Sequence, residues 1–256
     1  MTRRIAIANQ KGGVGKTTVT LGLASAASAA GISTLVIDLD PQGNATSCLG
    51  VDPADLEFTA NDVLHADAKG VAADAIAPSK WDHISLIGSD LSLAERDGDQ
   101  ALGSEHRLRK ALDTDALGNF ELVLIDCQPS VGKLVSNALI ASDSVLIVTE
   151  PSVSASQGVA NVMHTVDTVK ELFNPALELR GVVLNRVPPR SREAEFRTEE
   201  LGSALGERLW SPHIPLRTVI AEAQGAREPI HAYGSRAADL ISIFDAHLAR
   251  IMNGGK

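Results

Sequence analysis

Residues 9–18 read Asn-Gln-Lys-Gly-Gly-Val-Gly-Lys-Thr-Thr, and this stretch decides the fold. It follows an apolar run at residues 5–8, which is typical of a buried strand, and it leads into a helical pattern over residues 17–30. A strand, a glycine-rich turn and a helix in this order form the context of a phosphate-binding loop. The stretch therefore predicts a nucleoside-triphosphate site at the carboxyl end of the first strand.

The residue types of this loop suit phosphate chemistry. Gly12, Gly13 and Gly15 let the backbone take positive φ and approach phosphates closely, so that successive N–H groups point at anionic oxygens. We expect Lys16 to reach the β- and γ-phosphates and the Thr17 hydroxyl to ligate Mg²⁺, while the following helix presents its positive dipole end. The predicted ATP-binding residues of the loop are Lys11, Gly12, Gly13, Val14, Gly15, Lys16, Thr17 and Thr18.

Apolar runs of strand length recur along the chain between helical patterns. The predicted strands span residues 5–8, 34–37, 84–87, 122–125, 145–148 and 182–184, and the predicted helices span residues 17–30, 107–113, 131–141, 154–173 and 236–251. Residues 51–82, rich in Ala and Asp, are expected to hold short helices at the sheet edge. Runs that are apolar on both faces indicate strands covered by helices on each side. The order predicts a single α/β domain over residues 1–256, a P-loop NTPase with a doubly wound, mainly parallel sheet flanked by helices, and no helix-turn-helix module ahead of the first strand.

The composition is that of a globular protein. Of the 256 residues, 44% are hydrophobic, and the longest apolar stretches are too short to cross a bilayer. No signal peptide precedes the first strand, so we expect a cytoplasmic location. Cys48 and Cys127 match neither a disulfide framework nor a metal knuckle, and we expect both to be reduced, small, buried side chains.

Charge is distributed unevenly along the chain. The formal net charge of −9 argues against a general nucleic-acid binder, because phosphate contact needs clustered Lys and Arg. Between Arg186 and Arg236, however, eight Arg stand against seven Glu, so that this part carries +1 and the rest of the chain −10. The asymmetry permits a local basic face.

Three aspartates follow predicted strands, at the edge where an open α/β sheet binds its ligands. Asp38 and Asp40 begin the stretch Asp-Leu-Asp-Pro-Gln-Gly-Asn, and Asp126 follows a later strand. A magnesium nucleotide needs carboxylates near the metal, and hydrolysis needs a group that orients water toward the γ-phosphate. An aspartate at a strand end is also often a helix N-cap, but three of them in a chain with a phosphate loop favour the metal and water roles.

Together these motifs closely resemble the ParA/Soj family of partitioning ATPases. In the phosphate loop Gln10 replaces the first glycine of the strict pattern and Lys11 adds a second lysine, which is the deviant form of the ParA and MinD group. The motifs at residues 38–44 and 125–127 match as well, and the similarity continues through residues 137–143 and 214–223, so that it covers nearly the whole chain. The Asp-Pro-Gln-Gly-Asn sequence is typical of the partition branch rather than of MinD.

The resemblance implies roles for individual residues. Lys11 resembles the signature lysine that crosses a dimer interface to the partner's nucleotide, and Asp40 resembles the residue that positions the attacking water. With Lys16 these are the predicted catalytic residues. The other implied contacts are Thr17, Asp38 and Asp126 at Mg²⁺, and Asn185 and Pro215 at adenine.

Two positions depart from the family pattern. Gln128 stands where family members usually have the first proline of Asp-Cys-Pro-Pro. Val219 stands where an arginine tied to DNA binding is common, and Arg217 lies two residues earlier. The residues predicted to contact DNA are Arg190, Arg192, Arg217 and Arg227.

The function that the resemblance implies is that of an ATP-hydrolysing partition protein with ATP and Mg²⁺ as cofactors. ATP would close two subunits into a sandwich homodimer that holds DNA without sequence preference, and a ParB-like centromere-binding adaptor would trigger hydrolysis and release. The protein would then be associated with the nucleoid. A ParA-like ATPase that positions a protein cargo is an alternative that the sequence separates poorly from this one.

Two further alternatives match the sequence less well. Membrane-surface placement in the manner of MinD needs a basic amphipathic helix at the C-terminus, whereas Arg250 and Lys256 are the only Lys or Arg of residues 240–256. We therefore expect this stretch to pack on the core and expect no stable membrane association. An iron–sulfur reductase shares the deviant loop but bridges a cluster with two cysteines per subunit, and the positions of Cys48 and Cys127 do not match that pattern.

Overall fold

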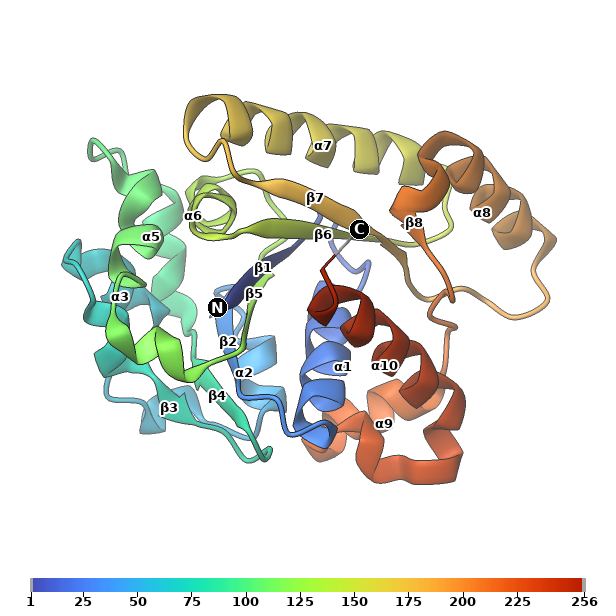
Figure 1. Cartoon of the computed structure of the whole chain (residues 1–256), viewed down its shortest axis with the longest axis horizontal. Helices are drawn as coiled ribbons and strands as arrows, with labels where there is room; N and C mark the ends of the chain where they lie inside the picture. Colours follow the sequence, from blue (N-terminus) through green and yellow to red (C-terminus); the bar gives the residue numbers. More distant parts are fainter. Residues whose placement is uncertain (1, 255–256) are drawn as a thin grey trace.

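One sheet runs through the molecule and has helices on both faces (Figure 1). The computed structural model of the chain describes residues 2–254. The strand order is β3-β4-β2-β5-β1-β6-β7-β8, and neighbours pair in parallel except for β3 with β4. The strands are β1 (Arg3–Ala8), β2 (Thr34–Leu39), β3 (Ala77–Pro78), β4 (Ile84–Ile87), β5 (Leu122–Cys127), β6 (Ser144–Thr149), β7 (Glu178–Leu184) and β8 (Leu209–Trp210).

The strands form where the apolar runs predict them. β2 and β5 are buried along their whole length, as expected for strands covered on both faces. The sequence does not predict β3 and β8, because a two-residue strand leaves no periodic pattern. The doubly wound, mainly parallel architecture is confirmed.

Helices form two layers. The α-helices are α1 (Lys16–Ala29), α2 (Asn44–Cys48), α3 (Ala60–Ala66), α4 (Ala94–Asp97), α5 (Arg107–Ala111), α6 (Lys133–Ala141), α7 (Ala155–Leu172), α8 (Arg192–Leu205), α9 (Thr218–Ala226) and α10 (Ala238–Met252). In the core, α1, α9 and α10 share one side of the sheet, and α3, α5, α6 and α7 share the other (Figure 1). The predicted helices are confirmed to within a few residues, whereas α8 and α9 lie outside those predictions.

The terminal helix α10 belongs to the core. Leu240, Phe244, Leu248 and Ile251 recur at helical spacing and are all buried, and α10 packs against α1. This confirms core packing for residues 240–252, so the apolar stripe of this helix is already covered. Among residues 2–254, no helix is both long enough and apolar enough to span a membrane.

Residues 51–82 form the outer part of the β3–β4 edge. They hold the 3-10 helix η1 (Pro53–Asp55), α3, the 3-10 helix η2 (Val71–Ala75) and β3. The predicted short helices at the sheet edge are confirmed. Thr59 caps α3 in a capping box with Asp62, whose Oδ2 accepts from the Thr59 N–H at 2.8 Å.

Candidate nucleotide-binding site

The loop between β1 and α1 turns over the carboxyl end of the sheet. Gly13 and Gly15 have φ of +80° and +89°, and α1 begins at Lys16. A Cβ on Gly15 would lie 2.1 Å from Asn185 Nδ2, so glycine is also needed there for the close approach to the end of β7. The prediction of positive φ at Gly12 is wrong. A Cβ on Gly12 would lie at an ordinary 3.8 Å from the Cβ of Pro129.

Lys16 lies inside this loop and is 7% exposed. Its Nζ is 3.5 Å from the carbonyl oxygen of Lys11. Burial lowers the pKa of Lys16, while the negative charge of Asp126 is the largest influence that raises it. The ammonium group therefore stands desolvated beside the turn of the loop, as a phosphate-binding cation should.

Asp126 is fixed against the first turns of α1. Thr17 Oγ1 donates to Asp126 Oδ2 at 2.7 Å, and Thr20 Oγ1 donates to Asp126 Oδ1 at 3.1 Å. The aspartate is fully buried, and this burial raises the pKa of its carboxyl, with the charge of Asp38 acting in the same direction. The structure thus brings Thr17 and Asp126 together, as the sequence predicts for a metal site.

Asp38 lies beside Asp126 on the neighbouring strand, where their Cα atoms pair across β2 and β5. Thr46 donates to Asp38 Oδ2 through its N–H at 2.9 Å and its hydroxyl at 2.8 Å, and the Ser89 N–H donates to the same hydroxyl at 3.0 Å. Burial raises the pKa of Asp38, and the hydrogen bonds from Thr46 oppose the shift. Two buried carboxyl groups thus lie side by side at the carboxyl end of the sheet, next to the loop.

Asp40 heads the turn that follows β2. Its carboxylate accepts from the Gln42 N–H at 3.0 Å, and its carbonyl accepts from the Gly43 N–H at 2.9 Å. Gly43 has φ of +61°, and a Cβ there would lie 3.0 Å from the Ser89 carbonyl oxygen. The turn is therefore packed tightly against the end of β4, while Asp40 itself stays partly exposed.

Lys11 contacts its own chain. Its Nζ donates to Glu150 Oε1 at 2.7 Å and lies 3.2 Å from Ser152 Oγ. The start of the loop is held by Asn9, whose buried amide donates to the Val148 carbonyl at 2.6 Å and accepts from the Lys11 N–H at 2.9 Å. The side chain of Lys11 is 37% exposed, so solvent still reaches it.

A pocket of about 200 Å³ opens beside the loop, between the end of β7 and α9. Asn185 and Pro215, which are both predicted to contact the adenine base, line this pocket together with Thr18. Asn185 is fully buried and its Nδ2 donates to the Val14 carbonyl at 2.9 Å, whereas its buried Oδ1 has no partner among the described residues. An acceptor without a hydrogen-bond partner thus lies buried in the wall of this pocket.

Arg186, which the sequence analysis does not assign to the site, also lines this pocket. It has φ of +56° and its guanidinium donates to the Gly13 carbonyl at 2.6 Å. Gln224 on α9 lines the pocket too, and its Nε2 donates to Thr18 Oγ1 at 3.3 Å. Arg186 follows the end of a strand, and this position is the one sequence feature that could have indicated a ligand contact. The sequence around Gln224 contains no feature that predicts a place in the site.

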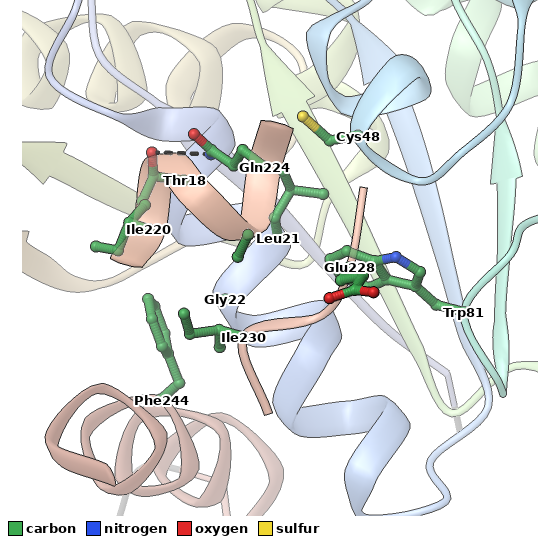
Figure 2. A pocket seen from close by; sticks show the side chains of 11 residues that line it. Thr18, Leu21, Gly22, Cys48, Trp81, Ile220, Gln224, Glu228, Ile230 and Phe244 are labelled. Carbon is green, nitrogen blue, oxygen red and sulfur yellow. Dashed lines mark hydrogen bonds between the residues drawn. The ribbon is translucent and has the colours of Figure 1, made fainter. Parts of the chain in front are cut away.

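Behind the Thr18 and Gln224 pair lies a small apolar cavity, with an accessible volume of about 30 Å³ (Figure 2). Leu21 on α1, Phe244 on α10 and Ile220 on α9 face it, and Trp81 closes another side. The Trp81 indole donates to the Arg227 carbonyl at the end of α9 at 3.0 Å. Helix α9 therefore lies between this cavity and the pocket lined by Asn185 and Pro215, which we call the base-side pocket.

The cysteines lie on opposite sides of the sheet. Cys127 is buried as expected, but Cys48 is only partly buried and lies at the cavity of Figure 2, so the expectation is wrong for Cys48. Burial raises the pKa of both thiols. Two neutral thiols that pack against different faces of the sheet do not form a pair of cluster ligands.

The four arginines predicted at DNA are all exposed. Arg217 forms an ion pair with Asp239 and also lines the base-side pocket. Arg190, Arg192 and Arg227 make no ion pair with other described residues. Three of the four thus keep an unneutralised charge at the surface.

Known proteins share this fold and these motifs. Residues 2–179 match the family model described as AAA domain. The chromosome partitioning protein ParA of Caulobacter vibrioides is 36% identical over 239 residues, which are 92% of this chain and 89% of that protein. The sporulation initiation inhibitor protein Soj of Bacillus subtilis is 35% identical over 239 residues, which cover 93% of each chain.

A solved structure is similar over the whole length. Cobyrinic acid a,c-diamide synthase from Mycobacterium smegmatis, solved with bound ADP and magnesium, aligns with a TM-score of 0.82 and 30% identity, over 100% of this chain and 98% of that one. Both the ParA and the Soj relative are more than 30% identical to this chain, and each match covers more than nine-tenths of it. This chain belongs to the ParA/Soj family of partitioning ATPases.

Proposed function

We propose that this chain binds ATP together with Mg²⁺ and hydrolyses it to ADP and phosphate. The observation that carries the proposal is the hydrogen bond from Thr17 to the buried Asp126, directly beside Lys16. A hydroxyl, two carboxyl groups and a desolvated cation at a helix start are the set that a magnesium nucleotide requires. The similar solved structure holds ADP and magnesium.

Each residue has a separate task in this proposal. Lys16 holds its charge at the β- and γ-phosphates, Thr17 presents its hydroxyl to Mg²⁺, and Asp126 orients that hydroxyl. Asp38 adds negative charge next to Asp126. Asp40, partly exposed at the mouth of the turn, orients the attacking water. Bound Mg²⁺ supplies charge neutralisation at the phosphates.

The pocket beside β7 is proposed to select adenine. One N–H of Asn185 Nδ2 is donated to the Val14 carbonyl, which fixes the orientation of the amide, and Oδ1 remains as an acceptor without a partner among the described residues. Adenine presents an amino group and guanine a carbonyl at the same ring position. An unpaired acceptor that meets the guanine carbonyl would stay unsatisfied, which costs about 1–3 kcal/mol.

For the cellular role we propose partition of plasmid or chromosomal DNA, because relatives that match most of this chain are named for chromosome partitioning. Two ATP-bound copies close face to face, and Lys11 exchanges Glu150 for the partner's nucleotide. The side chain of Lys11 is 37% exposed, and a solvent-accessible, hydrogen-bonded ion pair such as that with Glu150 can be exchanged at low cost. A ParB-like adaptor then stimulates hydrolysis. The protein acts in the cytoplasm, at the nucleoid.

The DNA face is proposed around the arginines of α8 and the end of α9. Dimerisation doubles a modest set of phosphate contacts, which a single subunit of net charge −9 lacks. Arg190, Arg192 and Arg227 are the main candidates because no carboxylate of the described residues pairs with them. Arg217 contributes less, since Asp239 already neutralises it.

The test is DNA binding against salt concentration, with ATP, with ADP and without nucleotide. The parental protein should bind only with ATP, and Lys11→Ala should bind ATP as a monomer but lose the dimer, hydrolysis and DNA binding. Arg192→Ala should lower the salt slope by about one unit, while Arg109→Ala on α5, with the same charge change, should leave it unaltered. Equal DNA affinity in all three nucleotide states would contradict the gating and favour a protein cargo.

A further inference from the structure

An apolar groove of about 280 Å³ lies between α3 and η2, at the β3–β4 edge of the molecule. It is lined by the apolar side chains of Phe58, Val63 and Val71 and, at its exposed rim, by Asp62, His65 and Asp74. Phe58 is 40% exposed, so part of this aromatic side chain is open to a partner. The groove shares no lining residue with the nucleotide site.

The rim of this groove carries two aspartates, Asp62 and Asp74, that form no ion pair with other residues of the described range 2–254. Residues 51–82 contain seven Asp and Glu against two Lys, a net −5 of the total −9. Asp74 is exposed and forms no ion pair with other described residues, and Asp62 uses Oδ2 to cap α3. Two cations nearby already have acidic partners: Arg96 pairs with Glu95 and Asp99, and Lys69 pairs with Asp113. Arg96 also contacts the rim, where its Nη1 lies 3.1 Å from Nδ1 of His65.

We propose that this groove docks a basic amphipathic segment of a partner protein. An apolar side chain of the segment packs on Phe58 and Val63, and a Lys or Arg next to it pairs with Asp74 or Asp62. A helix supplies such a pattern when apolar anchors recur at three- and four-residue spacing with cations beside them. Nucleic acids and anionic lipid surfaces are repelled by the same rim.

A second copy of this chain is a poorer occupant. A symmetric contact through the groove would set two acidic rims against each other, and like charges across an interface cost several kcal/mol. Helix α8, which begins at Arg192, lies beside β7 and β8 at the other end of the sheet (Figure 1). A partner in the groove therefore leaves the α8 part of the proposed DNA face free.

The test is a selection of random 16-residue peptides displayed on phage against the full chain without nucleotide. Enriched sequences should combine aliphatic or aromatic residues with Lys or Arg. A synthetic peptide of the enriched sequence should bind at least about tenfold more weakly to Phe58→Ser and to Asp74→Lys, and more weakly at high salt, because both apolar contact and charge are used. Both residues are exposed, so the variants should fold.

Leu172→Ser and Asp167→Lys on α7 are the matched controls for Phe58→Ser and Asp74→Lys. Both control residues are exposed and lie far from the groove, and the substitutions likewise replace an apolar side chain by Ser and an Asp by Lys. They should bind the peptide as the parental protein does. The proposal is overturned if no enriched peptide depends on Phe58 and Asp74, or if the enriched sequences lack cations. Self-association that Phe58→Ser abolishes, measured by sedimentation, would assign the groove to a second copy instead. Because no nucleotide is present, none of these outcomes depends on the proposed ATPase activity.

Discussion

The phosphate side and the base side of the nucleotide site are held together in different ways. On the phosphate side, the carboxylate of Asp126 accepts from two threonines of α1, and that of Asp38 accepts twice from Thr46. On the base side, Oδ1 of Asn185 has no hydrogen-bond partner among the described residues. Helix α9 meets α1 there through the 3.3 Å hydrogen bond of Gln224 to Thr18 and through apolar side chains around a small cavity (Figure 2).

The difference teaches how the site divides its work. Buried and fully bonded groups cannot move without leaving polar atoms unpaired, so the phosphate side is preorganised before any ligand arrives. The base side has an open pocket, and its wall, helix α9, packs over a small cavity. This wall can therefore shift when a ligand binds. Changes on the phosphate side should therefore have large effects, and changes at the base side should be smaller and affect selectivity.

The largest effect is expected for Lys16→Ala. Loss of the buried cation should weaken ATP binding by about 100- to 4,000-fold, because a hydrogen-bonded charge pair that loses one partner costs about 3–5 kcal/mol. Titration calorimetry with ATP measures it, and Lys170→Ala on the exposed face of α7 is the control. Binding within a few-fold of the parental value would mean that the phosphate side is not where ATP is held.

The next largest effect is expected for Asp40→Ala, which should lower the rate of hydrolysis without weakening ATP binding. Asp40→Ala should reduce the turnover number about 100-fold or more, because a positioned acid–base group contributes about that much, while ATP affinity changes little. Steady-state phosphate release and ATP titration together measure the two quantities. Asp52→Ala, an exposed aspartate outside the site, should change neither. Parental turnover in Asp40→Ala would move the water-orienting role to another group.

A smaller effect is expected on the base side. Asn185→Ala should weaken ATP binding by about tenfold and narrow the preference for ATP over GTP by a similar factor, since one buried hydrogen bond contributes about 1–1.5 kcal/mol. The ratio of ATP and GTP dissociation constants is the measurement, and Asn161→Ala on α7 is the control. An unchanged ratio together with weaker binding would assign Asn185 a purely structural role through Val14.

The smallest effect on ATP affinity is expected for a change in α9, the helix between the base-side pocket and the cavity. Gln224→Ala removes only the 3.3 Å hydrogen bond to Thr18, and it should change ATP affinity by less than about fivefold, as a partly exposed neutral bond contributes about 1 kcal/mol or less. Gln157→Ala, which breaks a similar side-chain contact on α7, is the control. A loss as large as that of Lys16→Ala would show that the base side is as rigid as the phosphate side.

Local sequence was sufficient for most of the fold and for the phosphate side. The glycine loop, the strand before it and the helix after it are contiguous, so their geometry follows from short-range preferences. Asp38 and Asp126 come at strand ends, and parallel strands bring their carboxyl ends to one edge, which is why both could be predicted at the same site. The two-residue strands β3 and β8 and the helices α8 and α9 carried too little periodic signal.

The tertiary structure alone decided the contacts between distant parts of the chain. The hydrogen bond from Gln224 to Thr18 joins residues 206 positions apart, and that from Arg186 to Gly13 joins residues 173 apart. The ion pair of Lys11 with Glu150 is another such contact. The groove that Phe58 lines exists only because η2 packs beside α3. Such pairs depend on how helices settle on the sheet, and no period in the sequence records that packing. The sequence by itself determined the phosphate loop and the carboxylates beside it, because their positions follow from neighbouring residues and from strand direction.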